Sequence, residues 1–181
     1  MGDTGRTIGL AQVAQQEPGH LPARIRAVAA QQEAHGHALA GDEAACHRKL
    51  DEAMELAAAE LTIEGPGRYC IPEFLEIQRA TCWVELGRPD RAVTIFEEQL
   101  TRLPSVHRRD RGVYLARLAR AYAGRDDADG AAMNARQALD GLATTGSRRI
   151  VSELVKLQPR LEQWRDVPGM TDLHTAVAGL C

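Results

Sequence analysis

The residues whose types and spacing are best suited to binding chemistry are two arginines at helical spacing. Arg117 and Arg120 lie three positions apart, so both face one side of a predicted helix. The opposite side of that helix carries an apolar stripe of Leu115, Leu118, Ala119 and Tyr122. Two guanidinium groups at this spacing can hold one carboxylate through paired hydrogen bonds. Arg117 and Arg120 are therefore a candidate clamp for a peptide carboxylate, although arginines at this spacing most often form a solvated face.

The segment before this helix is the only notably basic feature of the sequence. Residues 108–111 are Arg-Arg-Asp-Arg, and Arg148 and Arg149 follow one helix pair later. Such a cluster could contact a phosphate backbone or the acidic surface of a partner. Nearby aspartates offset its charge, and the whole chain has a net charge of −3 and a pI near 6.1. We therefore interpret the cluster as ordinary surface and expect no direct binding of nucleic acid by this chain.

The cysteines and histidines give no recognisable metal site. Cys46, Cys70, Cys82 and Cys181 form no CxxC pair. His37 and Cys46 bracket a predicted turn, but they lack the ligand number and the i, i+4 spacing that a metal site needs. We expect no metal, no cofactor and no disulfide framework, and we interpret the cysteines as reduced thiols of a cytoplasmic protein.

No group of residues forms a catalytic constellation. Gly65-Pro66-Gly67 lacks the lysine and the strand–helix context of a phosphate-binding loop. Ser147, and Ser105 with His107, are not set in a nucleophile elbow. We therefore expect that this chain is not an enzyme.

Composition indicates helices as the elements that position these residues. The 181 residues are 44% hydrophobic but only 4% aromatic, and no window alternates steadily between apolar and polar residues. No apolar run approaches the ~20 residues that a membrane span needs, and no secretory signal follows Met1. We therefore expect an all-α, soluble, cytoplasmic protein with no membrane partner.

The segment 71–104 predicts one complete helical hairpin. Its two apolar stripes are separated by Gly87, which can end the first helix, and Pro89, which suits the first turn of the second. Pro104 stops the second helix. The stripes are Phe74, Ile77, Ala80 and Val84 in the first helix and Ala92, Ile95, Phe96 and Leu100 in the second.

We expect the chain to form a single domain over 1–181 made of similar units. We expect a half hairpin at 1–18 ending at Pro18-Gly19, hairpins at 21–61, 71–104 and 108–143, and a capping helix pair at 147–180. In the last of these, one helix runs from Arg148 to about Trp164, and a second from about Met170 to Leu180. Trp164 is expected to cover the edge of the last hairpin.

The predicted turns share a signature. Gly87 has Trp83 four residues before it and Ala92 five residues after it. The same spacing recurs around Gly41, with His37 and Cys46, and around Asp126, with Tyr122 and Ala131. A ring late in the first helix and a small residue early in the second are typical of closely crossing helices.

This pattern resembles a tetratricopeptide repeat (TPR) array. Trp83, Ala92, Phe96 and Pro104 match the second half of the repeat motif. The resemblance implies a TPR-like α-solenoid of about nine helices arranged in antiparallel hairpins.

A narrower resemblance covers about Leu21 to the end of the chain. The segments GRPDRAVTIFEEQL, HRRDRGVYLARLARAYAG, ATTGSRRIVSEL and EQWRDVPG resemble the C-terminal TPR region of actinobacterial helix-turn-helix regulators of the Cro/repressor type. That resemblance implies a regulatory domain in transcription regulation that senses a ligand or mediates assembly. No DNA-binding domain fits ahead of Leu21, so we expect an isolated domain or a stand-alone descendant.

A solenoid would leave the first helices of its hairpins lining a concave groove. The residues expected on that groove are Gln31, His35, Gln78, Thr81, Glu85, Arg117 and Arg120. We predict that the groove binds a peptide or protein segment. A small-molecule sensor, which predicts an enclosed apolar pocket, and a structural dimerisation module with a homodimer as the assembly are the alternatives.

Overall fold

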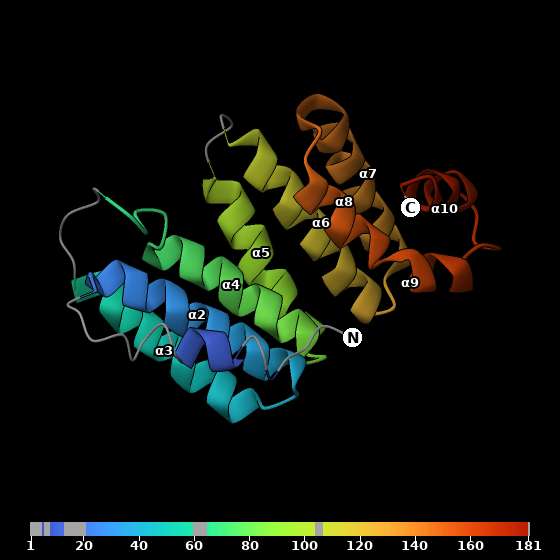
Figure 1. Cartoon of the computed structure of the whole chain (residues 1–181). Coiled ribbons are helices and arrows are strands. Elements are labelled where there is room, and N and C mark those ends of the chain that lie inside the picture. Colours follow the sequence, from blue (N-terminus) through green and yellow to red (C-terminus); the bar gives the residue numbers. More distant parts are fainter. Residues whose placement is uncertain (1–4, 6–7, 13–20, 60–64, 104–106, 181) are drawn as a thin grey trace. The chain divides into compact units, whose positions relative to one another are not determined.

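The computed structural model describes residues 5, 8–12, 21–59, 65–103 and 107–180, and within these ranges the chain is all-α (Figure 1). The all-α prediction is confirmed. No described helix is both long enough and apolar enough to cross a membrane. The chain forms two compact units, Met1–Gly87 and Arg88–Cys181. The boundary falls inside the segment 71–104, and the predicted arrangement of 1–181 as one domain stays a prediction.

The first unit contains three long helices and a short helical stretch at 8–12. The long helices are α2 (Ala23–Leu39), α3 (Glu43–Ala59) and α4 (Pro72–Glu85). Helix α2 packs along α3, and α4 contacts both (Figure 1). Their core is built largely from small residues, among them Ala27, Ala30, Ala34, Ala38, Cys46, Ala53, Ala57 and Cys82. Small side chains at these positions let the helix axes approach closely.

A buried carboxylate connects three parts of this unit. The Glu33 side chain is only 3% exposed and lies 3.0 Å from the Nζ atom of Lys49 on α3. It also accepts a hydrogen bond of 3.0 Å from the Gln12 amide of the 8–12 stretch. Gly36 lies beside the same stretch, where an added Cβ would come 2.6 Å from the Cγ1 atom of Ile8. These contacts fix residues 8–12 against α2.

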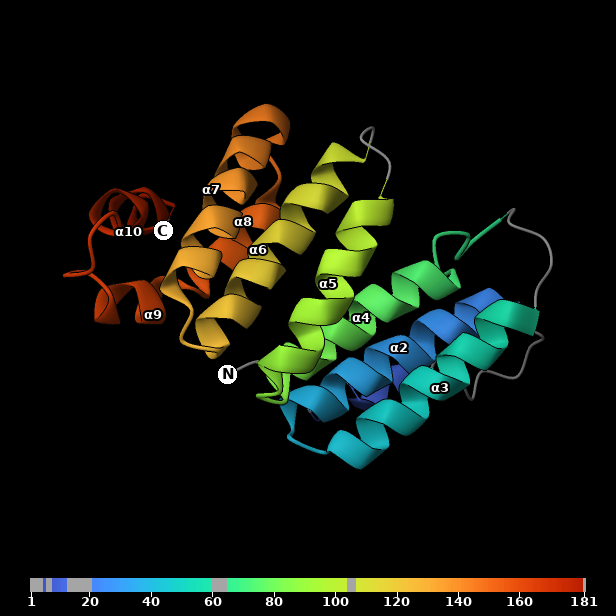
Figure 2. The ribbon, with the colours of Figure 1, turned by 180° about the vertical axis from the view of Figure 1, so that it is seen from behind.

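The second unit contains helices α5 to α10. Their bounds are α5 (Pro89–Arg102), α6 (Arg108–Gly124), α7 (Ala128–Thr145), α8 (Arg148–Val155), α9 (Gln158–Gln163) and α10 (Thr171–Ala178). Helix α6 lies between α5 and α7 and contacts both, as Figure 2 shows from behind. Helix α8 contacts α6 and α7, while α10 contacts α7, α8 and α9.

The expected single helix from Arg148 to about Trp164 was wrong, because the structure breaks it after Val155. Helix α9 starts at Gln158 with a proline in its first turn. Pro159 has no backbone N–H and its ring clashes with the preceding turn, so one helix cannot continue through it. Trp164 is buried, and its indole N–H donates to Asp126 Oδ1 at 3.3 Å, which links the end of α9 to the α6–α7 turn.

The three matched turn positions share a backbone conformation. Gly41, Gly87 and Asp126 all have positive φ, of 80°, 70° and 62°. Asp126 is the one residue other than glycine with a positive φ in the described ranges. The next residue, Asp127, caps α7 by accepting a hydrogen bond of 2.8 Å from the Gly130 N–H. The local turn chemistry therefore agrees with the signature found in the sequence.

The described cysteines are free and buried, as expected. Cys46 pairs with the Cys82 thiol rather than with His37, and this hydrogen bond lowers the pKa of Cys46. His37 lies instead 3.8 Å from Glu33. Burial raises the pKa of Cys70 to about 11. Pro18, Pro104, Ser105 and Cys181, which also carried predictions, lie outside the described residues.

Candidate functional site

Three of the residues expected on a solvent-lined groove lie inside the first unit. Gln31 on α2 and Gln78 on α4 are 3% and 8% exposed, and the Gln31 amide donates to Gln78 Oε1 at 3.4 Å. Thr81 is 3% exposed, and its hydroxyl donates to the Ile77 carbonyl at 2.9 Å. The expectation that these three side chains face a groove was therefore wrong. Helix α4 contacts both α2 and α3, so its buried face is wider than the predicted stripe.

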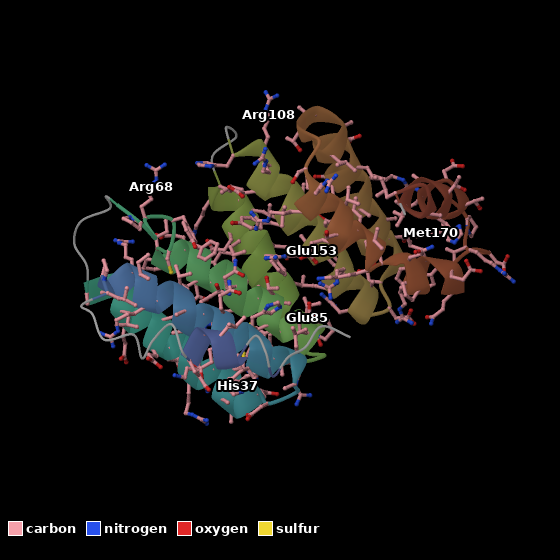
Figure 3. The ribbon with its side chains drawn as sticks, in the orientation of Figure 1. His37, Arg68, Glu85, Arg108, Glu153 and Met170 are labelled. Atoms are coloured by element: carbon pink, nitrogen blue, oxygen red, sulfur yellow. The ribbon has the colours of Figure 1, made fainter. Side chains whose placement is uncertain are left out.

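The other two groove residues of the first unit are half-buried. They are His35 on α2 and Glu85 near the end of α4, and Glu85 is labelled in Figure 3. Their predicted role in binding a ligand stays a prediction.

Arg117 and Arg120 hold one carboxylate, and it belongs to this chain. Arg117 Nε lies 3.0 Å from Glu153 Oε1, and Arg120 Nη1 lies 2.9 Å from Glu153 Oε2. Lys156 Nζ adds a third cation at 3.2 Å from Oε2. Glu153 lies on α8, at the position labelled in Figure 3. Both carboxylate oxygens are thus engaged from α6.

The electrostatics of this cluster favour the ionised carboxylate. Glu153 is 7% exposed, and its burial, the largest single effect on its pKa, acts to raise that pKa. The charges of Arg117, Lys156 and Arg120 and the hydrogen bond from Arg117 together outweigh burial and lower the pKa of Glu153 to about 2. The carboxylate that Arg117 and Arg120 bind in the structure is therefore that of Glu153 and not, as expected from the sequence, that of a peptide. The sequence did not reveal the acid that satisfies them.

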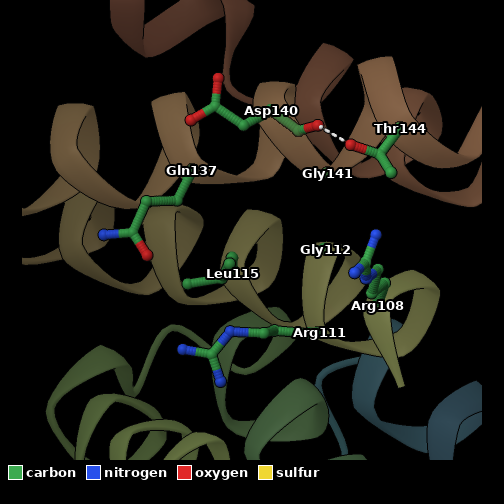
Figure 4. A pocket seen from close by; sticks show the side chains of 8 residues that line it. All are labelled: Arg108, Arg111, Gly112, Leu115, Gln137, Asp140, Gly141 and Thr144. Carbon is green, nitrogen blue, oxygen red and sulfur yellow. Dashed lines mark hydrogen bonds between the residues drawn. The ribbon is translucent and has the colours of Figure 1, made fainter. Parts of the chain in front are cut away.

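An open pocket lies over the α6–α7 pair. Its volume is about 350 Å³, and it is open to solvent. The lining residues come from the first turns of α6 and the last turns of α7, as Figure 4 shows: Arg108, Arg111, Gly112, Leu115, Gln137, Asp140, Gly141 and Thr144. Most of them are polar or charged. This volume falls at the small end of the ~300–1,000 Å³ range of ligand pockets.

Two of the lining residues are glycines at which α6 and α7 come close together. Gly112 and Gly141 face each other across the helix pair, and a Cβ added to Gly141 would lie 3.4 Å from the Gly112 Cα. Without side chains at these positions the two helices approach closely, and Ile150 of α8 packs against both glycines. A glycine inside a predicted helix is the signal that could have located this close approach from the sequence.

The polar groups of the pocket are held in place to different degrees. Arg111 Nη1 donates to the Leu100 carbonyl at 3.0 Å, which fixes its guanidinium beside the end of α5. The Thr144 hydroxyl donates to the Asp140 carbonyl at 3.0 Å, as drawn in Figure 4. Arg108 extends from the start of α6 into solvent in Figure 3. The pocket therefore combines one cation held by a hydrogen bond, one exposed cation and a carboxylate.

A second hollow, of about 200 Å³, lies near the other end of α6. It is lined by Arg120, Ala123, Gly124, Lys156, Leu157 and Arg160. Arg160 donates to the Ala123 carbonyl at 3.0 Å and Arg120 to Glu153, so its cations already serve the fold. Its volume is below the usual range of ligand pockets. The α6–α7 pocket is therefore the better candidate for a binding site.

Among the described residues, no three histidine, cysteine or acidic side chains come close enough together to hold a metal ion. Comparison of the chain with protein-family models, curated proteins and solved structures gives no match.

Proposed function

We propose that this chain is a non-catalytic interaction module that binds a peptide or protein segment, working in transcription regulation in the cytoplasm. The observation that supports the proposal is the open pocket over α6 and α7, to which arginine, aspartate, glutamine and threonine side chains contribute. A segment of extended chain presents carbonyl, amide and charged groups, which such a lining can hydrogen-bond.

The shape of this pocket favours a segment over a small molecule. A sensor of small molecules needs an enclosed, mostly apolar pocket with a few polar anchors. The α6–α7 pocket is open to solvent and not enclosed. A peptide segment that lies in the pocket with both of its ends in solvent fits this open geometry better than a small molecule.

The architecture that goes with this proposal is the TPR-like solenoid with antiparallel hairpins. Its support is local: left-handed residues recur at Gly41, Gly87 and Asp126, where the sequence signature places equivalent turns. In this proposal Arg117 and Arg120 serve to hold α8 through Glu153, and the binding role moves to the α6–α7 pocket. A homodimer is the alternative assembly.

Blocking the pocket tests the proposed function. Thr144 lines the pocket and is exposed, so Thr144→Trp should fill it without disturbing the core. Ala143→Trp is the matched control, because Ala143 is the exposed neighbour on α7 but does not line the pocket. Peptides selected from a random display library on the full chain are expected to bind Thr144→Trp at least about tenfold more weakly, which is about 1.4 kcal/mol.

Two outcomes would contradict the proposed function. One is a selection that enriches no peptide. The other is a set of peptides that binds wild type, Thr144→Trp and Ala143→Trp with equal affinity in fluorescence polarisation.

A further inference from the structure

The ends of three helices of the second unit come together at the pocket. Pocket residues from the start of α6 and the end of α7 line it jointly, and the start of α8 lies beside them. Asp110 on α6 is 3.8 Å from the Nη1 atom of Arg149 on α8, which places the two helix starts side by side. This end of the unit carries five arginines, called the basic end below: Arg108, Arg109, Arg111, Arg148 and Arg149.

The basic end holds a local excess of positive charge on a chain that is negative overall. Its five arginines are offset by only two aspartates, Asp110 in the first turn of α6 and Asp140 near the end of α7. The whole chain has a net charge of −3. Arg108, Arg109 and Arg148 are exposed, and the described residues offer them no ion-pair partner. Their charges are therefore available to a partner.

The fold itself does not explain cations at these positions. The start of a helix carries a partial positive charge, so each arginine there costs roughly 0.3–1 kcal/mol of helix stability. The arginine pairs at 108–109 and 148–149 begin α6 and α8, whose N-cap residues make no capping hydrogen bond through their side chains. The N–H groups of two helix starts, the two helix dipoles and the arginine side chains thus attract negative charge at one place. An anionic partner would remove this local conflict.

A protein segment fits this surface better than a nucleic acid. An excess of three positive charges is small beside the ~6–10 phosphate contacts of a typical DNA-binding protein. None of the described residues that line the pocket carries an aromatic ring on which a base could stack. Asp140 repels both phosphates and carboxylates, but a peptide, unlike a phosphate backbone, also has N–H groups that can donate to Asp140, and Gln137 offers further amide hydrogen bonds.

We propose that the basic end and the adjoining α6–α7 pocket bind an acidic protein segment, in which aspartate or glutamate carboxylates pair with Arg108, Arg109 and Arg148 while the chain lies in the pocket. This inference rests on the proposed function and specifies its partner. Arg111, which is fixed by its bond to the Leu100 carbonyl, supplies the preformed anchor. The exposed arginines supply the charge that steers the segment to the pocket.

Binding of defined probes to the full chain tests the proposal. The probes are a fluorescein-labelled peptide of alternating Glu and Ser, the same peptide with Gln in place of Glu, and a single-stranded DNA of equal charge. We expect the glutamate peptide to bind at least about tenfold more tightly than the glutamine peptide or the DNA in anisotropy titrations. Its affinity should fall as salt rises from low to physiological concentration.

Substitutions of the exposed arginines test whether the glutamate peptide contacts the basic end. Arg108→Gln with Arg109→Gln should weaken the glutamate peptide at least about tenfold, and Arg148→Gln should weaken it further. Arg165→Gln is the control, because Arg165 is an exposed arginine of the same unit that pairs with Glu162 and Asp166 outside the basic end. Since the side chains at 108, 109 and 148 are exposed, circular dichroism should show unchanged folding.

The outcomes separate this proposal from the proposed function. Equal binding of the glutamate and glutamine peptides, or no binding of the glutamate peptide, overturns the acidic partner. If peptides from the display selection then still bind wild type and are blocked by Thr144→Trp, the proposed interaction module stands and only its acidic partner is overturned. Tighter binding of the DNA, lost in Arg108→Gln with Arg109→Gln, would make the basic end a nucleic-acid surface and would also overturn the acidic protein segment.

Discussion

Replacing Glu153 by glutamine tests how much the buried ion cluster contributes to the second unit. Glutamine keeps the shape of the side chain and one carbonyl acceptor but removes the negative charge. Arg117 and Arg120 would then lose the carboxylate that both contact at 3.0 and 2.9 Å. Removing one partner of a buried ion pair is costly because the remaining charge stays buried without compensation.

The pKa of Glu153 sets the magnitude. The folded unit lowers this pKa from an ordinary 4.5 to about 2, and each pKa unit corresponds to about 1.36 kcal/mol. The ionised form of Glu153 therefore contributes about 3 kcal/mol to the free energy of unfolding at neutral pH. That value lies at the low end of the ~3–5 kcal/mol known for broken buried pairs.

The sign of the pH dependence follows from the direction of the shift. Because the folded pKa lies below the unfolded one, the unfolded chain binds the proton first as pH falls. The contribution of Glu153 is thus fully present above pH 4.5 and is lost as pH falls from 4.5 to about 2. The Glu153→Gln variant has no such titration, so its stability should approach that of wild type in acid.

Urea unfolding at several pH values measures this difference. Trp164 reports on the second unit, so Trp164 fluorescence is followed with Trp83 replaced by phenylalanine in both proteins. We expect Glu153→Gln to be about 3 kcal/mol less stable at pH 7, with a smaller difference at pH 4 and a still smaller one at pH 3.

Glu162→Gln is the matched control. The Glu162 side chain is 54% exposed and pairs with Arg165 and His174, so its loss should cost less than about 1 kcal/mol. A difference between wild type and Glu153→Gln that stays constant from pH 7 to pH 3 would refute the linkage argument. A cost at pH 7 no larger than that of Glu162→Gln would refute the role of the cluster.

Two further predictions concern the packing and turn of the α6–α7 pair. Gly112→Ala should lower the free energy of unfolding by about 1–2 kcal/mol, because the new Cβ would lie 2.4 Å from the Cδ1 atom of buried Ile150. Adding Ile150→Val, which removes that atom, should restore part of the loss in urea unfolding; an additive double variant would count against this clash. Asp126→Ala should cost about 1 kcal/mol in thermal unfolding, because alanine keeps the strained φ of 62° and loses the contacts with Arg160 and Trp164. Asp126→Asn, which keeps an acceptor and tolerates this conformation, should cost less, and equal losses would contradict the assignment.

Helix type and most helix ends could be predicted because their signals are local. Gly41 and Gly146 end helices with left-handed backbone, and Pro72 and Pro89 occupy first turns, as the residue types require. The break before Pro159 could also have been predicted, because proline disrupts the interior of a helix. The apolar stripe of the predicted helix runs across this position, and it led us to expect one continuous helix.

The partners of the polar groups could not be predicted, because they depend on which helices meet. Glu153 lies 36 residues from Arg117 in the sequence, and only the packing of α8 on α6 brings them together. Gln31 and Gln78 are 47 residues apart and satisfy each other inside the first unit. Helical spacing predicts which side chains share a face of a helix, but it does not predict whether another helix covers that face.

The shortness of α8 gives its link to α6 a consequence for folding. A helix of eight residues is too short to persist alone in water, so α8 depends on its contacts with the rest of the unit. Ile150 and Leu154 are fully buried, and Glu153 lies between them in the sequence. Detaching α8 would expose these two side chains and also separate Glu153 from its arginines. Helix α8 should therefore detach as a whole, and its backbone amides should exchange with solvent in one opening event.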